Sequence, residues 1–463
     1  MAGLTVSTST PPSGNSDHLD PVALTKQLVR FDTTNPPGNE ALCIDHIKAL
    51  LDGAGIQNQV LTKTAGRPNL IARLPGDGSA PPLLLQGHVD VVPAGPTPWQ
   101  QPPFGGDIVD GFLWGRGSLD MKSGIAMMLY AIMRAKTDGM TPAGDIVLAV
   151  VCDEESGGDS GARYLVEEHA EQFQGIKYAI GEFGGFSFEL GRRRFYPIMV
   201  AEKQVCHLRV TFRGAGGHAS LTQQDNPMTG LPTFLQRVQS RPLPTHVTPE
   251  ARMMFQAIGR HLSPPARVGL AALLNPRFTS LTLKLLGAKG RTFAPLFRNT
   301  VNPTVVRGGE QINVVPGEVT LDLDGRLLPN FSPEQLVSEL RAITGSDAVG
   351  IEVLSYDPGP KQPDMGLFDT LSNVLQESDP EGIPVPMPMP AATDDRLFAR
   401  LGIHNYGFLP MLLPKTLDSP RRSMAPMSVC RWTQSTSERA RSTACCNVTD
   451  APARRAWDMP KSV

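Results

Sequence analysis

The chain has 463 residues, with 43 Lys and Arg against 45 Asp and Glu and a pI ≈ 6.5. Because a domain usually comprises ~100–200 residues, this length predicts two or three folding units. The net charge of −2 argues against a general affinity for nucleic acid or anionic membranes, which requires a clear basic excess. No run approaches the ~20 apolar residues of a membrane span. The six cysteines show no CxxC spacing, so we expect a reduced, cytoplasmic protein without structural disulfides.

The first part of the chain alternates helical and strand patterns. Residues 1–19 are rich in Ser, Thr and Pro, lack the pattern of a secretory signal and predict a disordered arm. Two amphipathic helices are expected between Asp20 and Gly55. Beyond them, apolar strand patterns alternate with helical patterns, the strands at 82–92, 145–155 and 177–183 and the helices at 120–135 and 160–169. This alternation predicts a sheet covered by helices on both faces.

The character of the sequence changes after about Val205. Residues 206–214 and 319–328 alternate apolar and polar side chains at period two, which is typical of strands with one solvated face. We therefore expect a smaller α+β domain at 203–361, inserted between the two parts of a larger domain at 20–202 and 362–414. The predicted fold class is α/β, with a helix-covered mixed sheet interrupted by the α+β insertion.

Acidic and imidazole side chains follow the predicted strands. His88 and Asp90 end the first of them, and their i, i+2 spacing places both on one side of the strand. In open α/β sheets ligands bind at the carboxyl ends of strands, and a carboxylate commonly orients a metal-ligating histidine. A histidine satisfied within the core is the alternative for this pair.

Three further acidic positions have similar placements. Asp120 lies between a glycine-rich turn and a helix, where it could equally cap that helix. Residues 153–155 (Asp-Glu-Glu) follow the buried apolar run DIVLAVV at 145–151, where they need a cation or another partner unless they form an acidic loop. Glu182 ends the next apolar run. Taken together, one imidazole and several carboxylates from separate strand ends suit two divalent cations bridged by a shared carboxylate.

The order and spacing of these motifs resemble a family of co-catalytic zinc peptidases and amidohydrolases. The family includes glutamate carboxypeptidase, acetylornithine deacetylase, succinyl-diaminopimelate desuccinylase and aminoacylase. The motifs that carry the resemblance are GHVDVVP, RGSLDMKSG and DEESGG, and it extends from about residue 20 to about residue 415. It implies a hydrolase that cleaves an amide bond in a peptide or N-acyl amino acid with water activated by two zinc ions, for which cobalt or manganese could substitute. It also implies a homodimer in which residues 203–361 form the lid and dimerisation domain.

The resemblance assigns roles to the residues of these motifs. His88 and Glu182 would hold one metal, and Glu155 would hold the other. Asp120 would bridge the two metals. Asp90 would orient His88.

Other positions would act on the substrate. Glu154 would be the general base that takes a proton from water and delivers it to the leaving amine. His218, in GAGGHAS, would reach into the partner subunit's site to stabilise the oxyanion, although a glycine-rich turn with an exposed histidine is the alternative. Asn313 and Arg326 match positions that bind the substrate carboxylate. Thr393, Asp394 and Arg396, in AATDDR, lie where relatives line the substrate pocket.

The C-terminal part departs from the family pattern. The second metal needs a histidine from a stretch resembling His-Gly-x-Asp-Glu-Arg, but the last histidine, His404, precedes that position and has different neighbours. Residues 423–432, written as codons and regrouped one base earlier, can give His-Gly-Thr-Asp-Glu-Arg-Val-Pro-Val with permitted third bases. We therefore expect an aberrant, frameshifted tail at 415–463. The alternative function is a degenerate relative that binds one metal or has no activity.

Overall fold

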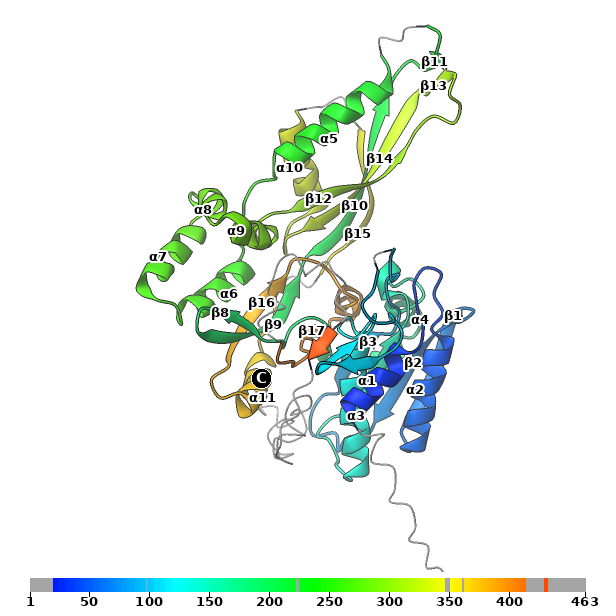
Figure 1. Cartoon of the computed structure of the whole chain (residues 1–463), viewed down its shortest axis with the longest axis vertical. Coiled ribbons are helices and arrows are strands. Elements are labelled where there is room, and N and C mark those ends of the chain that lie inside the picture. Colours follow the sequence, from blue (N-terminus) through cyan, green and yellow to red (C-terminus); the bar gives the residue numbers. More distant parts are fainter. Residues whose placement is uncertain are drawn as a thin grey trace, which may run out of the picture.

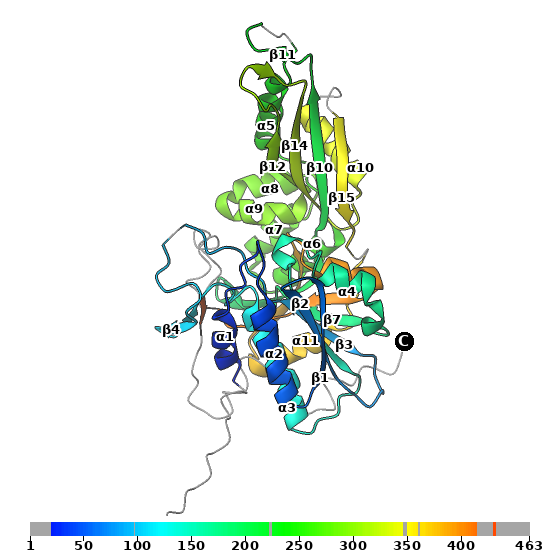
Figure 2. The same ribbon diagram turned by 90° about the vertical axis from the view of Figure 1, so that its right-hand side faces the viewer.

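A computed structural model of the chain describes residues 20–96, 98–221, 225–345, 350–359, 362–413 and 429–431. The predicted arm at 1–19 and nearly all of the predicted tail at 415–463 lie outside these residues. Figures 1 and 2 show a lower lobe built on a large sheet and an upper lobe built on a smaller one. Within the described part, no helix is long and apolar enough to cross a membrane.

The large sheet has nine strands in the order β1-β2-β6-β3-β7-β17-β9-β16, with β8 paired to β9. Their bounds are β1 Gln57–Thr64, β2 Arg67–Leu74, β3 Leu83–His88, β6 Ile146–Val151, β7 Tyr178–Gly181, β8 Phe188–Leu190, β9 Arg193–Glu202, β16 Ile383–Met389 and β17 His404–Gly407. Strand β3 runs parallel to both β6 and β7, whereas β2 is antiparallel to β6 and β17 is antiparallel to β9. The predicted mixed sheet is confirmed, and the carboxyl ends of β3, β6 and β7 meet at one edge.

Helices cover both faces of this sheet, as predicted. Their bounds are α1 Pro21–Val29, α2 Ala41–Gly53, α3 Lys122–Thr137, α4 Ala162–Glu168, α11 Phe368–Ser378 and α12 Asp395–Phe398. Helices α1, α2, α3 and α11 bury side chains such as Leu28 and Ile125 on one face, and α4 and α12 bury Leu165 and Phe398 on the other. Asp20 caps α1 by accepting a hydrogen bond from the Val22 amide at 2.9 Å.

The upper lobe contains a four-stranded antiparallel sheet in the order β12-β14-β10-β15. The strands are β10 Gln204–Arg213, β12 Thr300–Arg307, β14 Glu318–Leu327 and β15 Gly350–Asp357, and α5 Gly230–Ser240 and α10 Pro333–Thr344 cover one face. Along β14, buried side chains alternate with exposed or half-buried ones. The period-two pattern therefore corresponds to a sheet with one covered face. At the tip of this lobe, β11 Gly217–His218 pairs with β13 Val314–Val315 (Figure 1).

Four helices between α5 and β12 pack against the large sheet. They are α6 Pro249–Gly259, α7 Pro264–Leu273, α8 Thr279–Leu285 and α9 Gly287–Phe293. Buried side chains of this segment pack with Phe195 of β9 and Val385 of β16. Among them are Phe255 of α6 and Phe297, which follows α9. Part of the segment predicted as the lid domain thus contacts the large sheet, and the predicted domain boundaries stay a prediction.

Short elements complete the described chain. A three-stranded sheet joins β4 Asp107–Val109, β5 Phe112–Trp114 and β18 Val429–Arg431. The 3-10 turns are η2 Glu154–Ser156, η3 Ala170–Phe173, η4 Pro227–Thr229, η5 Ala294–Phe297 and η6 Ala399–Leu401. Cys43, Cys152 and Cys206 are buried free thiols.

Candidate metal centre

Five of the predicted side chains come together above the carboxyl ends of the central parallel strands. His88 is the last residue of β3, Glu154 and Glu155 lie in the turn after β6, and Glu182 directly follows β7. Asp120 joins them from the loop before α3. We call these five residues the acidic cluster. Since β3, β6 and β7 are parallel neighbours, their ends meet at the place where open α/β sheets bind ligands.

The imidazole of His88 lies at the centre of the acidic cluster. Its Nε2 is 3.0 Å from Oδ1 of Asp120, 3.4 Å from Oε2 of Glu182 and 4.0 Å from Oε2 of Glu154. Its Nδ1 is 2.9 Å from the main-chain oxygen of Asp90. Because a carbonyl oxygen only accepts, this contact holds the proton on Nδ1 and directs Nε2 toward the carboxylates.

Two overlapping groups in the cluster have the arrangement of metal ligands. One consists of His88, Asp120 and Glu155, and the other of His88, Glu154 and Glu182; in each, the ligand atoms lie within 4.8 Å of one another. The structure therefore gathers the four predicted ligands, and it also places the predicted base Glu154 within ligand distance. The assignment of separate roles to these residues stays a prediction.

Asp90 contacts both His88 and the turn that carries Glu154 and Glu155. Its side chain is fully buried, and its oxygens accept hydrogen bonds from the amides of Glu154 and Glu155, both at 3.1 Å. Asn35 donates a further hydrogen bond to Asp90 at 2.8 Å. Asp90 thus ties the end of β3 to the turn that carries the two glutamates.

A buried ion-pair triad holds the other side of that turn. Arg67 of β2 bonds to Asp153 at 2.7 Å and to Glu40 at 2.7 and 3.2 Å. The three side chains are at most 12% exposed. Asp153 itself has a φ of 71°. This left-handed conformation is unfavourable for a residue other than glycine, so the surrounding contacts must stabilise it. No sequence pattern points to Glu40, Arg67 or Asn35, because each lies outside the recognised motifs.

Burial and crowding of like charges dominate the electrostatics of the cluster. Burial raises the pKa of Glu154 well above its usual value, and the neighbouring Glu182 raises it further. Burial also raises the pKa of Glu155 to about 7, although His88 opposes this shift. For His88, burial disfavours the charged form, but hydrogen bonds to Asp120, Asp90 and Glu182 raise its pKa well above the usual range.

The cluster fits a divalent cation. Four carboxylates surround one imidazole, and zinc binds this set of nitrogen and oxygen donors. Asp394 lies close enough to contribute to the raised pKa of Glu154. It is only 2% exposed, and among the described residues its carboxylate oxygens have no hydrogen-bond partner, although Arg396 lies 3.7 Å from its Oδ1. Such an excess of buried negative charge is costly without a compensating cation.

The 391–396 segment packs against the turn that carries Glu154 and Glu155. Arg396 donates to the main-chain oxygen of Gly157 at 2.9 Å. The next residue, Gly158, has a φ of +81°, and a Cβ there would lie 2.7 Å from Oδ1 of Asp394. Thr393 donates two hydrogen bonds to the buried Glu202, at 2.7 and 3.0 Å. This segment is therefore buried beside the acidic cluster.

The predicted residues of the upper lobe do not join the cluster within one chain. His218 lies in β11 at the tip of the lobe (Figure 1), where Nδ1 is 2.7 Å from Oγ of Ser220. The main-chain oxygen of Asn313 accepts from Ala219 at 3.0 Å. Arg326 on β14 forms an ion pair with Asp324 at 2.8 Å.

The described residues contain no second histidine in either ligand group. His404 begins β17 opposite Tyr178, the first residue of β7, so it lies at the other end of the strands from His88. The frameshift predicted at 415–463 falls outside the described residues except for 429–431.

The chain belongs to Peptidase family M20/M25/M40, whose sequence profile matches residues 84–419. This match confirms the predicted resemblance. Within the family, the chain is 28% identical over 357 residues to carboxypeptidase S-like 2 of Dictyostelium discoideum, covering 73% of this chain and 66% of that protein. It is 29% identical over 371 residues to the N-fatty-acyl-amino acid synthase/hydrolase PM20D1 of Xenopus tropicalis, covering 78% and 70%. It is 34% identical over 233 residues to succinyl-diaminopimelate desuccinylase of Cereibacter sphaeroides, covering 49% and 58%.

Solved structures show the same fold. The M20 family metallo-carboxypeptidase Sso-CP2 from Sulfolobus solfataricus superposes with a TM-score of 0.60 at 16% identity, covering 84% of this chain and 91% of that one. Human carnosine dipeptidase 1 gives a TM-score of 0.57 at 16% identity, covering 86% and 92%. At this level of identity the likeness establishes the architecture of the two lobes.

Proposed function

We propose that this chain is a metal-dependent hydrolase that cleaves an amide bond in a peptide or an N-acyl amino acid. The observation that carries the proposal is the convergence of His88 with four carboxylates at the ends of three parallel strands. Relatives named as a carboxypeptidase-like protein, an N-fatty-acyl-amino acid synthase/hydrolase and a desuccinylase support this substrate class.

Two zinc ions are the proposed cofactor, with cobalt or manganese as substitutes. His88 and Glu182 would hold one ion, Glu155 would hold the other, and Asp120 would lie between them. When bound, the metals would lower the pKa of water toward ~7 and polarise the substrate carbonyl. The contact between Nδ1 of His88 and the main-chain oxygen of Asp90 supports this assignment, because it leaves Nε2, which faces the carboxylates, as the nitrogen that could bind a metal.

Glu154 is the proposed general base. Its carboxylate accepts a proton from the attacking water, and the same oxygen then delivers that proton to the nitrogen of the leaving amine. The position of Glu154 supports this role, because its Oε2 lies 4.0 Å from Nε2 of His88, beside the predicted metal ligands. Asp90 positions this base through the Glu154 amide.

Substitution of Glu154 by Gln tests the base assignment. Glu154→Gln should retain the metal but lose nearly all hydrolysis of N-acyl amino acids, since an amide cannot take a proton from water. The matched control is Glu171→Gln, which changes an exposed glutamate in the turn after α4 and should leave hydrolysis normal. Unchanged turnover in Glu154→Gln would exclude this residue as the base.

A second candidate is a degenerate relative that binds a single metal and hydrolyses poorly. The absence of a second histidine from the ligand groups of the described residues favours it. The metal content of the purified chain separates the two candidates, because two tight zinc ions support the dinuclear hydrolase and one supports the degenerate relative. The homodimer, with His218 acting in the partner's site, and the cytoplasmic location remain part of the proposal.

A further inference from the structure

The four-helix segment between α5 and β12 has an unusual charge distribution. Residues 251–299 contain no Asp or Glu but eight Lys and Arg, namely Arg252, Arg260, Arg267, Arg277, Lys284, Lys289, Arg291 and Arg298. The rest of the chain carries 35 Lys and Arg (43 less these eight) against 45 Asp and Glu. The net charge of −2 predicted no affinity for membranes. It is the sum of a basic segment at 251–299 and an acidic remainder of the chain.

These cations are available to an external partner. Among the described residues, none of the eight forms an ion pair with a carboxylate, and all but Arg252 and Arg298 are exposed. Arg252 and Arg267 donate only to main-chain oxygens, at 3.4 Å and 2.9–3.0 Å. Figure 1 shows α7 and α8 at the outer edge of the molecule, with α9 next to α8 on the inner side.

Exposed apolar side chains lie among the cations. Leu281 and Leu285, four residues apart on α8, are 55% and 78% exposed, and Val268 on α7 is 71% exposed. Phe278 and Leu286, which flank α8, are also exposed. The inner face of the same helix is buried through Leu283, so the outer leucines are not needed for the core. We call the exposed cations and these five apolar residues the basic-apolar surface.

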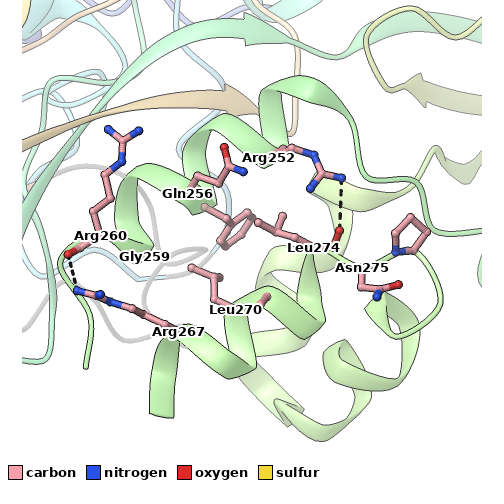
Figure 3. A pocket seen from close by; sticks show the side chains of 11 residues that line it. Arg252, Gln256, Gly259, Arg260, Arg267, Leu270, Leu274 and Asn275 are labelled. Atoms are coloured by element: carbon pink, nitrogen blue, oxygen red, sulfur yellow. Dashed lines mark hydrogen bonds between the residues drawn. The ribbon is translucent and has the colours of Figure 1, made fainter. Parts of the chain in front are cut away.

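A pocket opens between α6 and α7 beside this surface (Figure 3). It has a volume of about 700 Å³ and is lined by Phe255, Leu270 and other apolar side chains. Arg252, Arg260 and Arg267 also line it. An apolar hollow beside guanidinium groups suits an acyl chain that carries an anionic headgroup.

We propose that the basic-apolar surface docks the protein on an anionic lipid bilayer. Cations mixed with exposed aliphatic side chains on surface helices are the combination that inserts into the headgroup boundary of such a bilayer. Nucleic acid would use the cations but would gain little from Val268, Leu281 and Leu285. A second copy of the chain, related by a two-fold axis, would oppose the same cations to one another. The proposal does not depend on the hydrolytic function.

Vesicle co-sedimentation of the full chain tests this docking. Phosphatidylcholine vesicles that contain phosphatidylglycerol should bind the protein at low salt, pure phosphatidylcholine vesicles should bind it weakly, and high salt should reduce binding. Lys284→Glu combined with Lys289→Glu should weaken binding about 25-fold or more, since each cation contributes roughly fivefold. Leu281→Ser combined with Leu285→Ser should weaken it about tenfold.

The matched control carries Leu42→Ser and Lys136→Glu, changes at an exposed leucine and an exposed lysine outside the segment. It should bind like the original chain, and unchanged thermal unfolding of all variants would show that each is folded. Equal binding of the control and the Lys284/Lys289 variant would overturn the proposal. No binding to anionic vesicles at low salt would also overturn it. So would binding to single-stranded RNA but not to vesicles, or the finding that the original chain forms a dimer that the Leu281/Leu285 substitutions dissociate.

Discussion

Removal of the Arg67 guanidinium should destabilise the lower lobe and loosen the turn that carries Glu154 and Glu155. Arg67→Met leaves the carboxylates of Glu40 and Asp153 buried without a cation, at side-chain exposures of 0% and 6%. Breaking a buried ion pair in this way costs about 3–5 kcal/mol of unfolding free energy. The affinity for zinc should fall as well, because Asp153 is the first residue of that turn.

Arg73 provides the matched control on the same strand. It forms an ion pair of similar length, 2.8 Å, with Asp145, but both side chains are about one-third exposed. Arg73→Met should therefore cost only about 0–1 kcal/mol. Urea unfolding of both variants in a metal chelator, followed by circular dichroism, compares the two sites without a contribution from bound metal. If Arg67→Met and Arg73→Met differ by less than about 1 kcal/mol, the triad does not hold the turn as described.

Three further predictions concern pH, the partner subunit and the tail. Hydrogen bonds from Arg209 and Arg307 lower the pKa of Asp322 from 3.8 to about 2. The stability that this group contributes is therefore present above its ordinary pKa of 3.8 and is lost as the pH falls through about 2, so urea unfolding of Asp322→Asn should converge with that of the original chain only below pH 2. If His218 acts in the partner's site, mixing His218→Ala with Glu154→Gln should restore some hydrolysis in heterodimers, and no recovery after verified subunit exchange would oppose a shared site. Restoring the reading frame from about residue 415 should raise zinc content and activity, and equal values for both chains would show that the tail supplies nothing.

The acidic cluster could be predicted because its members follow strands that the hydrophobic pattern identifies. Since the ends of parallel neighbours must meet, the strand pattern predicts that His88, Glu154 and Glu182 lie at one edge of the sheet. Their supporting contacts could not be predicted. Arg67 and Glu40 are 27 positions apart, and Arg67 and Asp153 are 86 apart, and no periodic pattern links residues over such separations.

The upper lobe shows a second limit of sequence patterns. Period-two alternation predicted strands such as 319–328, and the observed β14 spans Glu318–Leu327. The helices between residues 249 and 297 have amphipathic patterns, but a pattern states only that one face is buried and not which sheet buries it. Their packing on β9 and β16 became evident only from the contacts of Phe255 and Phe297. In the same way, the whole-chain charge could not indicate that residues 251–299 carry eight cations and no carboxylate.

The zinc content of the purified chain and of His88→Ala tests the central claim most directly. Both proteins would be loaded with zinc, dialysed and measured by mass spectrometry, with Glu154→Gln as the variant that should retain metal. The proposed site predicts at least one zinc per chain in the original protein and in Glu154→Gln, and a large loss in His88→Ala, because His88 is shared by both ligand groups. Equal zinc in His88→Ala and in the original chain would contradict a metal centre at these strand ends.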